Sequence, residues 1–98
     1  MIRTPEGKDI SGEFFAIVML DKLGVERYRV TQERLDYIFI EIMRNAKFTN
    51  QEFQTIKEQI GKVVPASMKL EYRFVDDMPV SNTGKFRLTV SKLQDKGN

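Results

Sequence analysis

The sequence predicts an α+β fold, a two-layer sandwich in which two helices pack on a small mixed or antiparallel sheet of about three to five strands. Two observations predict it: helical and strand-like patterns alternate along the chain, and both helices have start signals. The chain has 98 residues, of which 41% are hydrophobic and 31% are charged. Those values are typical of one soluble domain with one core, so we expect residues 1–98 to form a single domain.

The chain begins with a tight turn. Residues 3–8, "RTPEGK", contain Pro5 and Gly7, which favour turns, and they are expected to join two short extended pieces that end near Ile10.

The first helix is predicted to begin after Ser11, whose hydroxyl suits an N-cap, and to run to Leu23. Ile10 and Phe15 stand at the two ends of a hydrophobic staple. Gly24 stands where a left-handed C-terminal cap is expected. The predicted apolar stripe consists of Phe14, Phe15, Ile17, Val18, Met19 and Leu20, with Asp21 as a weaker member.

Two strands are predicted next. Residues 25–32, "VERYRVTQ", alternate as a half-buried strand does, and residues 33–37 can turn the chain. Residues 35–43, "LDYIFIEIM", have isoleucines on one face and aromatic rings on the other. This pattern predicts a central strand with both faces largely covered.

The second helix has the clearest start signal in the chain. Thr49 and Glu52 form a capping box, Phe48 and Phe53 can staple it, and the apolar face continues until Gly61. Residues 68–75 then alternate as a strand. Residues 86–91 alternate similarly and favour a terminal strand, with a short helix as the alternative.

Composition excludes several chemistries. The chain has no cysteine and no histidine, so disulfides, thiol nucleophiles and Ser-His-Asp hydrolysis are excluded, and no metal site is expected.

Sixteen basic against 14 acidic residues give a net charge of only +2, a weak argument for a nucleic-acid partner. Arg27, Tyr28 and Arg29 lack the surrounding motif of an RNA-binding sheet. No apolar run has signal or membrane-span length, so a cytoplasmic protein without membrane contact is expected.

The Gly84-Lys85 step invites comparison with a phosphate-binding loop. The Walker pattern needs a glycine at Pro79 and a serine or threonine at Phe86, so that interpretation fails. On composition alone, Asn82 and Gly84 supply turn conformations in a hairpin or crossover loop. The preceding pair, Asp76 and Asp77, is expected to be a solvated strand end, because adjacent strand residues point to opposite faces.

Four stretches carry a family resemblance that spans nearly the whole chain: "TPEGKDISGEFF", "GVERYRVTQERLDYIFIEI", "IKEQIGKVVPASMKLEYRF" and "VDDMPVSNTGKFRLTVSKL". Together they resemble the C-terminal end of adenylate-forming ligases. More narrowly, they resemble the phenylacetate:coenzyme A ligase family and its CapK-type relatives, which are associated with capsular polysaccharide synthesis.

The resemblance implies that Lys85 is the mobile catalytic lysine, which bridges the substrate carboxylate and the nucleotide α-phosphate. The loop that it implies for substrate and nucleotide contact comprises Ser81, Asn82, Thr83, Gly84 and Arg87. A preorganised lysine is apt, because its compact charge stabilises charge redistribution in a water-poor site. The parent enzyme would be an acid–thiol ligase that uses ATP, Mg²⁺ and coenzyme A on a small-molecule carboxylic acid.

The same resemblance implies that the 98 residues are one piece of that enzyme. Their partner would be a large AMP-binding N-terminal domain, and the isolated chain is expected to be inactive and to hold no cofactor. Val80 departs from the basic residue that many relatives have there, and no hinge residue is identifiable. The competing hypothesis is a free-standing α+β binding module for a small ligand, RNA or a protein. The identity of the acid, the acyl acceptor and the oligomeric state stay open.

Overall fold

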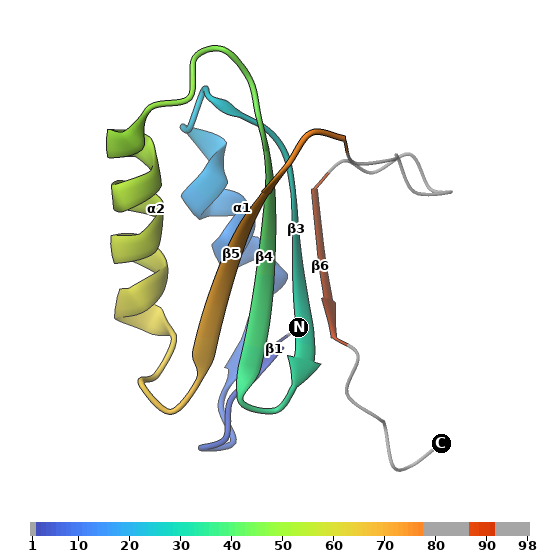
Figure 1. Cartoon of the computed structure of the whole chain (residues 1–98). Coiled ribbons are helices and arrows are strands. Elements are labelled where there is room, and N and C mark those ends of the chain that lie inside the picture. The colour runs from blue at the N-terminus through green and yellow to red at the C-terminus, as the bar shows by residue number, and fades with distance from the viewer. Residues whose placement is uncertain (1, 78–86, 92–98) are drawn as a thin grey trace.

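The structure, a computed structural model, describes residues 2–77 and 87–91 (Figure 1). Its elements in chain order are β1 (Ile2–Arg3), β2 (Asp9–Ile10), α1 (Gly12–Leu20), β3 (Val25–Arg34), β4 (Tyr37–Arg44), α2 (Asn50–Val63), β5 (Lys69–Val75) and β6 (Arg87–Ser91). Both helices lie on the same side of the main sheet in Figure 1. The predicted two-layer α+β sandwich is therefore confirmed.

The main sheet is mixed and has four strands in the order β5-β4-β3-β6. β3 and β4 form an antiparallel hairpin, β5 runs parallel to β4, and β6 runs parallel to β3. The expected central position of residues 35–43 is thus confirmed for β4. β1 and β2 pair separately as a small antiparallel ribbon around the predicted turn, where Gly7 has a φ of 89°.

The core lies between the helices and one face of the sheet. Ile38, Ile40 and Ile42 of β4 are fully buried, and their register partners Tyr28 and Val30 on β3 are buried beside them. The helices contribute the buried side chains Phe15, Val18, Met19, Ile56 and Ile60. Burial of this apolar area is the main force that holds the two layers together. Among the methionines, Met19 and Met68 are buried in this core and Met43 is half-buried.

Both helix N-caps are confirmed. The Ser11 hydroxyl accepts a hydrogen bond from the Glu13 N–H at 3.0 Å, and the Thr49 hydroxyl accepts one from the Glu52 N–H at 3.1 Å. The Glu52 carboxylate, however, does not serve a simple capping box. It accepts a hydrogen bond from the Gly24 N–H at 3.1 Å, which ties the start of α2 to the start of β3.

The predicted end of the first helix was wrong. α1 ends at Leu20, because Asp21 leaves the helical conformation and the Lys22 ammonium reaches back to the Val18 carbonyl at 2.9 Å. Gly24 has no positive φ, so it is not a left-handed cap. A Cβ at this glycine would stand 2.2 Å from the Phe48 Cα, and close backbone approach therefore explains the residue.

The apolar stripe of α1 was only partly right. Phe15, Val18 and Met19 are buried, but Ile17 and Leu20 are 67% and 68% exposed. α2 continues past Gly61 to Val63, so the end expected at Gly61 was too early. The terminal strand is confirmed for Arg87–Ser91, whereas Phe86 lies outside the described residues.

Candidate functional site

One end of the main sheet brings together the chain segments to which the sequence assigns function. β5 ends there at Val75, whose register partner on β4 is Met43, and β6 begins there at Arg87, whose partner on β3 is Tyr28. The start of β3 and the end of β4 lie at the same end, because these strands are antiparallel. We call this the loop end of the sheet; it is the upper end in Figure 1.

The predicted catalytic loop connects the two edges of the sheet at its loop end. β5 and β6 are opposite edge strands, so the connection is a crossover and not a hairpin. β4 and β3 lie between these two edge strands, which are therefore roughly 14 Å apart at about 4.8 Å per strand spacing. Ser81, Asn82, Thr83, Gly84 and Lys85 lie outside the described residues. Arg87 is placed only by its backbone, as the first residue of β6.

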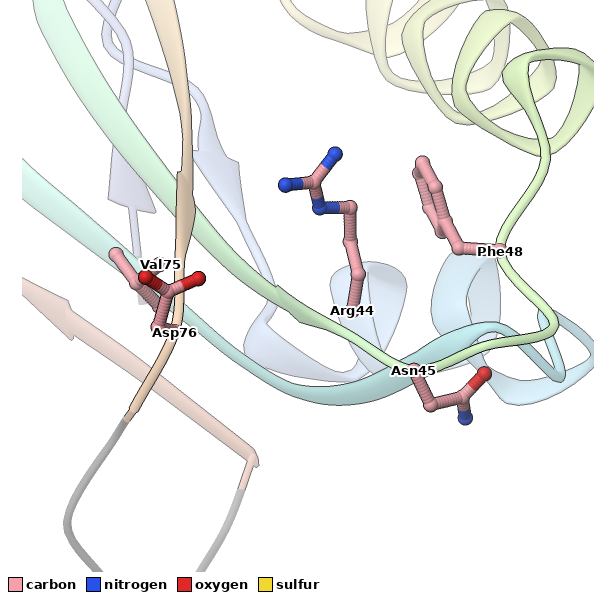
Figure 2. Close-up of a pocket in the computed structure, with 5 residues that line it drawn as sticks. All are labelled: Arg44, Asn45, Phe48, Val75 and Asp76. Carbon is pink, nitrogen blue, oxygen red and sulfur yellow. The ribbon is translucent and has the colours of Figure 1, made fainter.

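A pocket of about 320 Å³ opens at the loop end, between β4, β5 and the segment before α2 (Figure 2). Its lining residues are Arg44, Asn45, Phe48, Val75 and Asp76. In Figure 2 the side chains of Arg44 and Phe48 point to the same side, whereas the Asn45 amide points away from them. We call this the Arg44 pocket.

A hydrogen-bonded turn after β4 fixes one wall of the Arg44 pocket. The Asn45 N–H donates to the Gly24 carbonyl at 2.9 Å, and its side-chain amide donates to the Leu23 carbonyl at 2.8 Å. Its side-chain oxygen accepts a bond from the Lys47 N–H at 2.8 Å. Asn45 is therefore a structural residue that positions Phe48.

An aromatic cluster lies under the pocket. Phe74 packs edge-to-face against Phe48 and Phe53, with ring centroids 5.5 and 4.9 Å apart, and Tyr72 packs on Phe53 at 5.5 Å. The Arg44 guanidinium lies over the Phe74 ring, 4.1 Å from its centroid. This stacking orients the guanidinium plane and leaves the N–H groups along its edge available.

Tyr72 is the member of this aromatic cluster whose polar group is not fully hydrogen-bonded. Its buried hydroxyl has no hydrogen-bond partner among the described residues. Burial raises the pKa of Tyr72 to about 12, because desolvation disfavours the phenolate. Tyr72 is consequently a neutral packing residue at physiological pH.

A second pocket, of about 230 Å³, lies on the face of the sheet opposite the helices. Its arginines already have carboxylate partners: Arg34 lies 3.8 Å from Asp36, and Arg73 lies 3.7 Å from Glu71. Tyr37 also hydrogen-bonds Glu71. These neighbouring carboxylates largely neutralise the two arginines of this pocket.

The remaining sequence candidates do not form a site. Asp76 and Asp77 are both exposed, as expected for a solvated strand end. Tyr28 is buried in the core at 2% exposure, so it cannot stack on bases beside Arg27 and Arg29. In residues 2–77, no three potential metal-ligating side chains gather together. No helix in the described part of the chain is long and apolar enough to cross a membrane.

Sequence reasoning missed Arg44 and Phe48 as pocket residues. The available signal was that Arg44 continues the alternation of Ile38, Ile40 and Ile42 with a charge where an apolar residue is expected. The contact between Arg44 and Phe74 depends on strand pairing, which the sequence alone does not specify.

Comparison with known proteins gives one match. The family model described as CapK C-terminal domain matches residues 2–92. Neither a curated protein nor a solved structure matches the chain.

Proposed function

The chain belongs to the CapK C-terminal domain family, and from this membership we propose that it is the C-terminal lid domain of an ATP-dependent carboxylic acid:coenzyme A ligase. The proposed parent is similar to phenylacetate:coenzyme A ligase and acts in the cytoplasm in capsular polysaccharide biosynthesis. The family match over residues 2–92 carries this proposal, since it covers both strands that flank the Lys85 loop.

In the proposed reaction a carboxylate oxygen of the substrate attacks the α-phosphorus of Mg²⁺-bound ATP, and pyrophosphate leaves. The thiol of coenzyme A then attacks the acyl carbon, and AMP leaves. Lys85 would act in the first step, where its ammonium bridges the carboxylate and the α-phosphate as negative charge is redistributed. Domain closure would bring the lysine to the large domain and exclude water.

The arrangement of the described strands supports a role in aiming such a loop. The segment from Asp76 to Phe86 is anchored on both sides by hydrogen-bonded edge strands, which end and begin at the loop end of the sheet. Loops on a rigid scaffold are the usual carriers of catalytic residues. Ser81, Asn82, Thr83, Gly84 and Arg87 would then accompany Lys85 toward the nucleotide.

A free-standing binding module is the competing function. The observation that favours it is the Arg44 pocket, a binding-sized depression that belongs to this domain alone. Such a module would need neither Lys85 nor a large domain.

The native polypeptide separates the two functions. We would purify it from its own cells with an antibody raised against this 11.4 kDa chain, measure its mass, and assay carboxylate-dependent exchange of pyrophosphate into ATP. A polypeptide several times larger that exchanges pyrophosphate supports the ligase. A native mass of 11.4 kDa without exchange refutes the lid-domain proposal and favours the binding module.

A further inference from the structure

We propose that the Arg44 pocket binds a small phosphorylated sugar or sugar-like ligand, with Arg44 holding the phosphate and Asp76 accepting hydrogen bonds from hydroxyl groups. The pocket volume of about 320 Å³ suits a ligand of this size. This proposal does not depend on a role for Lys85.

Arg44 is the anion-binding group of this site. Its guanidinium is exposed and lies 4.1 Å above the Phe74 ring centroid, so its orientation is fixed without a carboxylate. A stacked guanidinium keeps a planar edge of N–H donors, whose geometry matches two oxygens of a phosphate. Less side-chain freedom is lost on binding when the group is already oriented.

The other arginines of the described part show why Arg44 differs. Four of them, Arg3, Arg29, Arg34 and Arg73, have a carboxylate within 4.0 Å. Arg44 has no carboxylate at that distance among the residues that the structure describes. An anion from solution can therefore bind Arg44 without displacing an internal partner.

The opposite wall restricts the class of anion. Asp76 is an exposed carboxylate that lines the same pocket, and it would repel a bare phosphate. It would instead accept hydrogen bonds from hydroxyl groups attached to the phosphate carrier. Asn45 does not take this role, because its amide already donates to the Leu23 carbonyl and accepts from the Lys47 N–H.

The Phe48 ring completes a pocket whose lining is otherwise mainly polar. Phe48 and Val75 line it together with the two charged residues. An aromatic ring packs well against the carbon skeleton of a sugar ring, while polar groups fix the orientation of the ligand. The combination of one cation, one carboxylate and one aromatic ring in a mainly polar lining fits a sugar phosphate better than a purely anionic ligand.

The test uses the 98-residue chain and three probes: ribose 5-phosphate, ribose and inorganic phosphate, each added at constant ionic strength. Amide chemical shifts in a ¹⁵N–¹H spectrum report the site of binding. We expect ribose 5-phosphate to shift the amides of residues 44–48 and 75–76, inorganic phosphate to bind there more weakly, and ribose alone to cause no shift.

Two variants and a matched control assign the roles. Arg44→Gln should weaken ribose 5-phosphate binding at least about tenfold, because a charged hydrogen-bond pair is lost. Arg34→Gln is the control, since Arg34 also stacks on a ring, Tyr37 at 4.7 Å, but faces Asp36. Asp76→Ala should strengthen inorganic phosphate binding and weaken ribose 5-phosphate binding.

The opposite response of the two probes to Asp76→Ala is the decisive result. Stronger binding of both probes would overturn the assignment of Asp76 as a hydroxyl acceptor and, with it, the sugar phosphate as ligand. Equal losses for Arg44→Gln and Arg34→Gln, or shifts outside the pocket, would overturn the site itself. Arg44→Lys separates loss of the charge from misfolding, because it also alters residue 44 but keeps the positive charge. It should bind ribose 5-phosphate more tightly than Arg44→Gln does.

Discussion

Replacement of Gly24 by alanine tests how the Arg44 pocket is built. The added Cβ would lie 2.2 Å from the Phe48 Cα and 2.6 Å from the Glu52 Oε1. Ordinary contact starts at 3.4 Å, so the two backbone segments must separate by about 1.2 Å. The segments that separate are the start of β3 and the turn that carries Phe48.

The expected loss of stability follows from that separation. Gly24 itself makes two hydrogen bonds to these neighbours: the Asn45 N–H donates to the Gly24 carbonyl at 2.9 Å, and the Gly24 N–H donates to Glu52 at 3.1 Å. Losing them costs about 0.5–1.5 kcal/mol each. Overpacking adds about 1–3 kcal/mol, so Gly24→Ala should destabilise the fold by about 2–6 kcal/mol.

Gly61→Ala is the matched control. Gly61 is in α2, and a Cβ there meets nothing within 4 Å. Alanine should therefore stabilise the helix by about 0.5–1 kcal/mol.

Urea unfolding followed by far-ultraviolet circular dichroism gives both free energies, provided that the transition slopes agree. A loss below about 1 kcal/mol for Gly24→Ala would contradict the close backbone approach. A comparable loss for Gly61→Ala would show that the region is generally intolerant of alanine.

Three further predictions use the same unfolding assay. Thr49→Ala should cost about 1 kcal/mol, since it removes the N-cap of α2; an unchanged midpoint would contradict the cap. Lys22→Met should lower the free energy of unfolding by about 1–3 kcal/mol, because the buried ammonium hydrogen-bonds Val18, Asp21 and Gln59. A stabilised variant would contradict a structural role for Lys22. Tyr72→Phe should raise stability by about 1 kcal/mol by removing an unpartnered hydroxyl. Because the pKa of Tyr72 is raised to about 12, native stability should fall as the pH rises from 10 toward 12, and Tyr72→Phe should remove that component.

The sequence predicted the local elements well because their signals are local. The hydroxyls of Ser11 and Thr49 cap their helices as expected, and the alternation of Ile38, Ile40 and Ile42 correctly identified the central strand. Hydrogen-bonding side chains next to a periodic apolar pattern specify these features within a few residues.

The features that the sequence did not predict depend on tertiary contacts. Gly24 looked like a helix cap, but its role depends on the Phe48 backbone, which is 24 positions away in the sequence. The Arg44 pocket likewise requires β5 to pair with β4, so that the end of β5 lies beside the end of β4 that carries Arg44. A sequence pattern does not determine which strands become neighbours.

The catalytic role proposed for Lys85 is tested by separating the two half-reactions in the polypeptide that contains the large domain. Lys85→Ala should slow acyl-adenylate formation by at least about 100-fold, the scale for losing a charge-stabilising group. Thioester formation from supplied acyl-adenylate should be nearly unchanged, and Lys69→Ala, at an exposed position on β5, should affect neither step. Equal loss in both half-reactions, or no loss in either, would contradict the assignment of Lys85 to adenylation.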